Sequence, residues 1–191
     1  MATNLPNLLT FSRILVIPAL VAAFYLEGAW SYWVPLGLFI TAGITDFLDG
    51  YVARAQNQTS NLGRFLDPIA DKLLISATIL MLVALDRIDG WTVLAALVIL
   101  LREILVSGLR EFLASVRVSV PVTALAKWKT ALQMVALGFL LAGKAGDAII
   151  LPGSMPVTTI GVVCLWIAAL LTLYTGYDYL RAGQTHLRKG A

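Results

Sequence analysis

The chain has 191 residues, of which 59% are hydrophobic and only 13% are charged, and its mean hydropathy is +0.85. A soluble domain of this length needs a polar coat that so few charged residues cannot supply, so the composition excludes an ordinary soluble enzyme. The formal net charge of +3 reflects basic residues gathered at one membrane face and does not indicate nucleic-acid binding.

Apolar runs of about 20 residues, the length that crosses the hydrocarbon of a bilayer, recur along the chain. They predict an all-α integral membrane protein with six transmembrane helices, forming one domain over residues 1–191. The stretch from Asn4 to Leu9 is compatible with a short amphipathic helix that lies on the membrane before the first span. The predicted spans are residues 12–27, 32–54, 62–84, 91–113, 124–143 and 157–180.

Lysine and arginine are distributed unevenly between the two sets of loops. With the amino terminus inside, the outer loops contain only Arg87 and Lys144, so twelve of the fourteen basic residues lie at or near the inner face. By the positive-inside rule, we expect both termini and the connection between the second and third spans on the cytoplasmic side.

Four aspartates stand close together in this apolar chain, on either side of a turn at residues 54–60. In the second span, one helical face carries Asp46, Asp49, Gly50 and Ala53. In the third span, one face carries Gly63, Asp67 and Asp71. At 1.5 Å of rise per residue, Asp46 and Asp71 both lie about 12 Å along their helices from the turn, so antiparallel packing brings the two faces together.

Four ionised carboxylates converging in a membrane would repel one another, and each costs about 2.5 kcal/mol or more to insert. Divalent cations bound between them would offset that cost. The ligands are oxygens, and the single histidine, His186, lies far off in the tail, so Mg²⁺ or Mn²⁺ fits and zinc does not. Charge balance predicts two ions held by Asp46, Asp49, Asp67 and Asp71. Simple pairing of the aspartates with nearby basic residues explains less well why both faces carry small residues.

The aspartates belong to a longer motif, Asp46-x2-Asp49-Gly50-x2-Ala53-Arg54-x8-Gly63-x3-Asp67-x3-Asp71. At every defined position it resembles the signature of the CDP-alcohol phosphotransferases, six-helix membrane enzymes that are commonly homodimers. They transfer a phosphoalcohol group from a CDP-linked donor to an alcohol and release CMP. The resemblance implies that the aspartates hold metal ions against the donor pyrophosphate and that Asp71 is the general base. It implies donor contacts for Gly50, Ala53, Arg54, Gly63, Asn7 and Arg13.

Residues 4–18 and 101–137 are similar to stretches of the bacterial phosphatidylglycerophosphate synthases, a branch of that family. This implies CDP-diacylglycerol as donor, glycerol 3-phosphate as acceptor, and a place among the lipids of a bacterial inner membrane. Because the acceptor is a dianion, we expect its phosphate to be bound by basic residues at inner helix ends, namely Arg110, Lys127 and Arg181. Deeper in the fourth span, Arg102 and Glu103 are predicted to form a structural ion pair, and Lys129 is predicted to be a membrane-face anchor.

Alternatives stay open at this point. A cardiolipin, phosphatidylinositol phosphate or phosphatidylserine synthase would share the aspartate site, because that site treats all hydroxyls alike. A divalent-cation transporter needs acidic residues along a path to the outer face, and the second and third spans offer none beyond Asp46 and Asp71. A non-catalytic protein that kept the fold is a third possibility.

Overall fold

A computed structural model describes residues 5–56, 61–116, 124–149 and 155–189 and forms them into helices joined by short turns. In this part of the chain there is no β-strand. The predicted all-α membrane protein with six helices is confirmed. The helices are α1 (Leu5–Ala23), α2 (Trp30–Gln56), α3 (Asn61–Ala84), α4 (Thr92–Ser115), α5 (Ala124–Ile149) and α6 (Val157–Lys189).

The first and last helices are longer than the predicted spans. Residues 5–9 continue directly into α1, so they do not form a separate interfacial helix. Pro6 suits this start, because a proline in the first turn lacks only an amide that a helix leaves unpaired there. At the other end of the chain, α6 continues past residue 180 to Lys189, through the basic tail that follows its apolar span.

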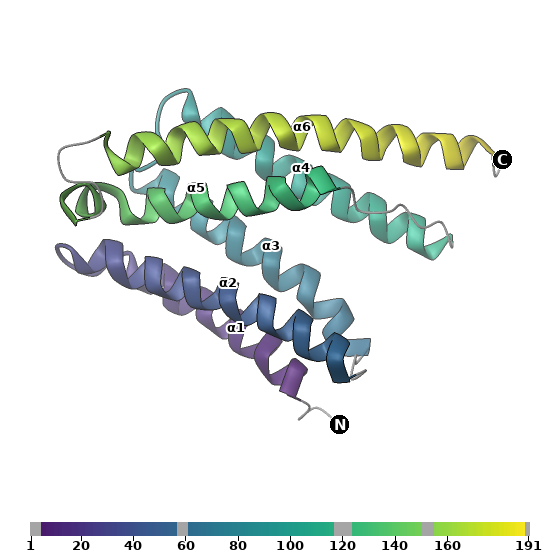
Figure 1. Cartoon of the computed structure of the whole chain (residues 1–191), viewed down its shortest axis with the longest axis horizontal. Helices are drawn as coiled ribbons and strands as arrows, with labels where there is room; N and C mark the ends of the chain where they lie inside the picture. The colour runs from purple at the N-terminus through teal and green to yellow at the C-terminus, as the bar shows by residue number, and fades with distance from the viewer. Residues whose placement is uncertain (1–4, 57–60, 117–123, 150–154, 190–191) are drawn as a thin grey trace.

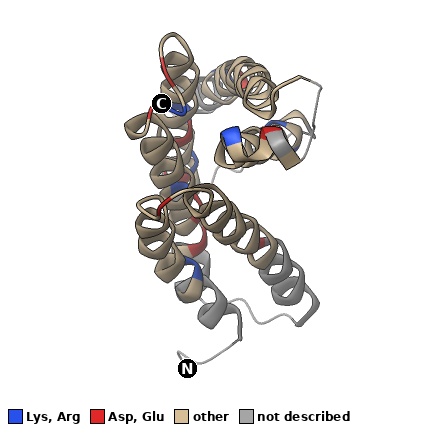
Figure 2. Ribbon diagram, turned by 90° about the vertical axis from the view of Figure 1, so that its left-hand side faces the viewer, with Lys and Arg blue, Asp and Glu red and all other residues tan. Residues whose placement is uncertain are grey.

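Within the described residues, three helices are long and apolar enough to cross a membrane, over Thr92–Ala114, Leu125–Asp147 and Val157–Arg181. A fourth apolar stretch, Ser12–Ala23, is shorter. Figure 2 shows that charged residues occupy few positions along the described ribbon. These helices therefore present apolar faces of the kind that lipid chains contact.

Consecutive helices run in opposite directions, so α1, α3 and α5 start toward the end of the molecule where α2, α4 and α6 finish (Figure 1). The N and C labels both lie toward the right of that view. This up-and-down arrangement puts the start of α1 and the end of α6 toward the same end of the bundle, which agrees with the asymmetric distribution of basic residues.

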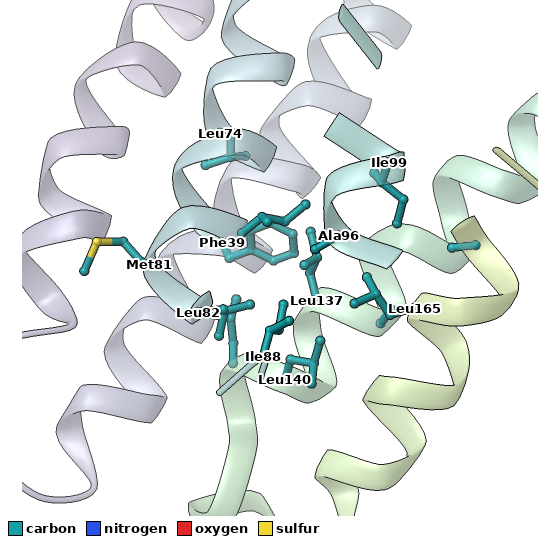
Figure 3. Packing of buried hydrophobic residues seen from close by; sticks show 14 of the residues in the cluster. Phe39, Leu74, Met81, Leu82, Ile88, Ala96, Ile99, Leu137, Leu140 and Leu165 are labelled. Carbon is teal, nitrogen blue, oxygen red and sulfur yellow. The ribbon is translucent and has the colours of Figure 1, made fainter. Parts of the chain in front are cut away.

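All six helices contribute to one apolar core, part of which is seen from close by in Figure 3. Each helix supplies at least one side chain that is 2% exposed or less, among them Leu20, Phe39, Leu82, Ile99, Leu137 and Leu165. Between membrane helices such contacts stabilise mainly through close van der Waals packing. The core thereby fixes the helices that carry the site relative to one another.

Arg87, in the turn between α3 and α4, ties helices together at the end remote from the aspartates. Its guanidinium carbon lies 3.8 Å from the ring centroid of Tyr32 and 5.3 Å from that of Phe24. It donates to the carbonyl oxygens of Ser31 at 3.0 Å and Leu141 at 3.3 Å. Burial lowers the pKa of Arg87, and the neighbouring Tyr32 opposes that shift. Together these contacts link the outer ends of α1, α2 and α5.

Candidate active site

Asp46 on α2 and Asp71 on α3 meet at one guanidinium from α1. Arg13 Nη1 lies 2.6 Å from Asp46 Oδ1 and 3.0 Å from Asp71 Oδ1. The Arg13 side chain is fully buried, whereas the Asp46 and Asp71 side chains are 45% and 50% exposed. The buried cation offsets repulsion between the two carboxylates and holds them beside each other. Both carboxylates nevertheless stay accessible to a ligand.

The structure shows less of the other predicted donor and metal residues. Asp67 lies one turn before Asp71 on α3. Among the side chains described, no three or more His, Cys, Asp or Glu are grouped closely enough to hold a metal ion. Asp46 and Asp71 offer only carboxylate oxygens, and this donor set fits Mg²⁺ or Mn²⁺. Six of the predicted donor and metal residues have side chains that lie outside the described part of the structure, namely Asn7, Asp49, Gly50, Ala53, Arg54 and Gly63.

A cavity of about 440 Å³ opens beside Asp46 and Asp71, between α2, α3, α4 and α5. We call it the carboxylate cavity. The two aspartates are part of its polar lining, and its apolar lining comes mainly from α2 and α3. The residues around it are Ala42, Gly43, Asp46, Asp71, Lys72, Leu74, Ile75, Ser76, Leu100, Glu103, Arg110, Thr130, Gln133 and Met134.

A second cavity, of about 430 Å³, lies between α3 and α4 and is called the basic cavity here. It shares three residues with the carboxylate cavity, so the two adjoin at Lys72, Glu103 and Arg110. Arg102 also lines it, which gives three basic side chains against two acidic ones, Glu103 and Glu111. A small anion could enter this cavity and remain next to Asp71.

On its other side the carboxylate cavity adjoins an apolar groove of about 580 Å³ between α2 and α5. The two share Gly43 and Met134. No charged side chain is among the described residues that line the groove, which are Leu36, Phe39, Ile40, Gly43, Ile44, Met134, Val135, Gly138, Phe139 and Ala142. The carboxylates therefore lie between an apolar groove and a basic cavity.

Glu103 on α4 is held by cations from two helices. Arg102 Nη1 donates to Glu103 Oε1 at 3.2 Å, which confirms the predicted ion pair, and Lys129 Nζ on α5 donates to the same oxygen. Arg102 Nη2 also donates to Thr175 Oγ1 on α6 at 3.0 Å. Lys129 is 2% exposed, so its prediction as a membrane-face anchor is wrong. A lysine buried this deeply needs a charged partner, and Glu103 supplies it.

Among the predicted acceptor residues, Arg110 borders both the carboxylate and the basic cavity. Lys127 and Arg181 are exposed, on α5 and α6. The basic cavity also brings in Lys72 and Arg102, which were not among the predicted acceptor contacts. Lys72 directly follows Asp71 on α3, and successive side chains on a helix point in directions about 100° apart. Asp71 can therefore border the carboxylate cavity while Lys72 also borders the basic cavity.

Comparison with known proteins identifies the family to which a chain with this site belongs. A family model described as CDP-alcohol phosphatidyltransferase matches residues 3–174. The chain belongs to this family. The motif resemblance is thereby confirmed, and the matched range contains every residue that lines the three cavities.

Several relatives of this CDP-alcohol phosphatidyltransferase carry a specific enzyme name. The "CDP-diacylglycerol--glycerol-3-phosphate 3-phosphatidyltransferase" of Rickettsia felis is 51% identical over 179 residues, which are 94% of each chain. The protein of the same name from Rickettsia typhi is 49% identical over 183 residues, 96% of this chain and 98% of that one. A "Cardiolipin synthase (CMP-forming)" of Oryza sativa subsp. japonica is 39% identical over 189 residues, covering 93% of this chain and 56% of that protein.

Proposed function

We propose that this protein transfers the phosphatidyl group of CDP-diacylglycerol to glycerol 3-phosphate, giving phosphatidylglycerophosphate and CMP. The observation that carries the proposal is the spatial order of the three spaces. The carboxylate cavity lies in the middle and adjoins the apolar groove on one side and the basic cavity on the other. The apolar groove suits the acyl chains of a lipid-linked donor, and the carboxylate cavity suits its pyrophosphate with bound cations. The basic cavity suits the phosphate of the acceptor. The names of the Rickettsia relatives agree with this donor and this acceptor.

The apolar groove supports a donor that carries acyl chains. It follows α2 from Gly43 to Leu36, which is about 10 Å at 1.5 Å per residue. That length is roughly a third of the hydrocarbon thickness of a bilayer. One acyl chain could lie in the groove, parallel to the helices, with its glycerol end beside Gly43 and its phosphates beside Asp46.

The chemical step is assigned to the carboxylate cavity. Asp71 takes the proton of the acceptor hydroxyl, and the resulting oxygen attacks the phosphorus that bears the diacylglycerol. The bond from that phosphorus to the bridging oxygen breaks, and CMP leaves with the electron pair. The four motif aspartates would hold Mg²⁺ or Mn²⁺, whose chemistry when bound is to neutralise charge on the pyrophosphate. Arg13 keeps Asp71 beside Asp46 and so orients the base.

The basic cavity is the proposed place for the acceptor phosphate. Lys72, Arg102 and Arg110 surround it, and its junction with the carboxylate cavity lies next to Asp71. A phosphate bound there would leave the attacking hydroxyl within the carboxylate cavity. Lys127 and Arg181 stay predicted acceptor contacts, and replacing each of them by alanine can test these predictions.

Membrane orientation and assembly complete the proposal. We place the aspartate end of the bundle at the cytoplasmic face of a bacterial inner membrane, because glycerol 3-phosphate is a soluble anion and basic residues concentrate at that end. The homodimer implied by the family resemblance stays a prediction.

We expect Arg110→Ala to raise the KM for glycerol 3-phosphate at least tenfold, because a charge-assisted hydrogen bond contributes about 1.5–3 kcal/mol. The KM for CDP-diacylglycerol should change by less than about twofold, since Arg110 is not among the residues that line the groove proposed for the acyl chain. Lys144→Ala, a basic residue on α5 toward its other end, is the matched control and should change neither constant. An unchanged acceptor KM in Arg110→Ala would remove Arg110 from the site.

The proposed function itself is tested by acceptor competition. Purified protein is given labelled CDP-diacylglycerol with glycerol 3-phosphate, serine, inositol phosphate or phosphatidylglycerol, first singly and then mixed. Preferred transfer to glycerol 3-phosphate with release of CMP is the expected result. Preferred transfer to phosphatidylglycerol would make the protein a cardiolipin synthase, the activity named for the rice relative. In that case the family assignment would stand and the proposed acceptor would be wrong.

A further inference from the structure

A buried amide in the wall of the carboxylate cavity has an acceptor atom that nothing in the described part of the chain satisfies. Gln133 on α5 is 3% exposed and lines this cavity together with Asp46 and Asp71. Its Oε1 atom has no hydrogen-bond partner among the described residues. Because a buried acceptor without a donor is unfavourable, a cavity that keeps one at its wall is suited to a ligand that brings the donor.

Neighbouring hydroxyls behave differently, since they donate within their own helices. Thr130, also at the carboxylate cavity, donates to the carbonyl oxygen of Ala126 at 3.1 Å. Thr78 on α3 is fully buried and donates to the carbonyl oxygen of Leu74 at 2.8 Å. Such local bonds satisfy short side chains in helices. Thr172 Oγ1 on α6 is also buried without a hydrogen-bond partner among the described residues, but Thr172 is not among the residues that line the carboxylate cavity, whereas Gln133 is.

Gln133 and the proposed base Asp71 line the same cavity from different helices, α5 and α3. Both helices start toward the same end of the molecule (Figure 1). An acceptor molecule that gives a proton to Asp71 in this cavity therefore occupies a space that Gln133 also borders.

The missing partner must be an O–H or N–H group. The phosphatidyl part of the donor offers ester and phosphate oxygens, which only accept hydrogen bonds. Glycerol 3-phosphate has two hydroxyls, and the one that attacks loses its proton to Asp71. The second hydroxyl, on the adjacent carbon, keeps its proton. With the phosphate in the basic cavity beyond Lys72, this second hydroxyl would remain in the cavity that Gln133 lines.

We propose that Gln133 Oε1 accepts a hydrogen bond from the second hydroxyl of the acceptor and so selects a vicinal diol over a simple alcohol. The inference rests on the proposed function, because it takes the acceptor to be a glycerol phosphate. Gln133 neither forms nor breaks a bond in the reaction. Its effect is specificity, since an acceptor without the second hydroxyl leaves the buried amide oxygen unmet.

The test compares two acceptors that differ only in the second hydroxyl, glycerol 3-phosphate and 3-hydroxypropyl phosphate. For the wild-type protein we expect kcat/KM to be about thirtyfold lower with the analogue. In Gln133→Met, whose side chain has similar length and no amide, the two values should agree within about threefold. Thr130→Val, on the same helix and at the same cavity, should keep the wild-type ratio. Each ratio is internal to one variant and so does not depend on the amount of folded protein.

Other outcomes overturn the inference in distinguishable ways. An equal loss with both acceptors in Gln133→Met would leave Gln133 a purely structural role. A raised KM for CDP-diacylglycerol with an intact acceptor ratio would assign the amide to the donor, whose ribose hydroxyls also donate. If wild-type protein ignores glycerol 3-phosphate but uses phosphatidylglycerol, the proposed function fails alone, and the ratio is measured on that lipid against its analogue without the second hydroxyl. Preferred transfer to serine would overturn both.

Discussion

Asp71→Asn should lower kcat about 10²- to 10⁴-fold, the usual contribution of a general base, while the Kd for CDP-diacylglycerol changes by less than about threefold. The substitution keeps the shape of the side chain and an oxygen that can accept the hydrogen bond from Arg13 Nη1. What it removes is the ability to take a proton from the acceptor hydroxyl. Turnover of labelled CDP-diacylglycerol and equilibrium binding of the same lipid in detergent micelles measure the two quantities separately.

Asp89→Asn is the matched control, because Asp89 is exposed in the turn between α3 and α4, at the other end of the bundle. It should leave both kcat and the Kd for the donor unchanged. If in Asp71→Asn the Kd rises as far as kcat falls, Asp71 acts mainly as a donor-binding ligand. The base would then have to be sought among the other carboxylates.

Helical spacing was enough to predict which aspartates meet. Asp46 and Asp71 lie at matching distances from one turn, and antiparallel packing alone brings their faces together. The apolar runs along the chain predicted the six helices, and in the described residues three of these helices are long and apolar enough to cross a membrane. Both results depend on local patterns that the sequence carries directly.

The surroundings of these carboxylates depend on how distant helices pack, and spacing along the chain carries no such information. The family resemblance implied a donor contact for Arg13, which stays a prediction, but nothing in the spacing indicated that its guanidinium is buried between Asp46 and Asp71. Lys129 looked like a membrane-face anchor because it lies near the start of a helix, yet it pairs with Glu103 of another helix. Gln133 gave no signal, since only burial distinguishes an unmet amide from a solvated one.

Under the proposed function, the aspartates meet only groups common to transfer from any CDP-linked donor, a pyrophosphate and a hydroxyl. The parts of the acceptor that differ would meet residues of the basic cavity, Lys72 and Arg110 among them, and Gln133 in the carboxylate cavity. Acceptor choice is therefore expected to change at these residues while the aspartate motif stays the same.

Removal of divalent ions should abolish transfer, and adding Mg²⁺ or Mn²⁺ should restore it. Without a divalent cation, the motif aspartates and the donor pyrophosphate would bring several negative charges together beside Arg13 and Lys72, and like charges at short distance repel strongly. The measurement is turnover after treatment with a chelator, together with the electron paramagnetic resonance signal of bound Mn²⁺ in protein that has not been given substrate. We expect two Mn²⁺ ions for each wild-type chain.

Asp46→Asn separates a metal site from a purely structural ion-pair cluster. The substitution takes one negative charge from a set that Arg13 already partly neutralises, so the affinity for Mn²⁺ should fall at least tenfold and turnover should fall with it. Asp89→Asn removes the same charge at the remote end and should bind Mn²⁺ as the wild-type chain does. Two results would contradict a metal site: full turnover in excess chelator, or Mn²⁺ binding by Asp46→Asn equal to that of the control. Asp46 and Asp71 would then serve only to hold Arg13, and basic side chains alone would neutralise the charge of the pyrophosphate.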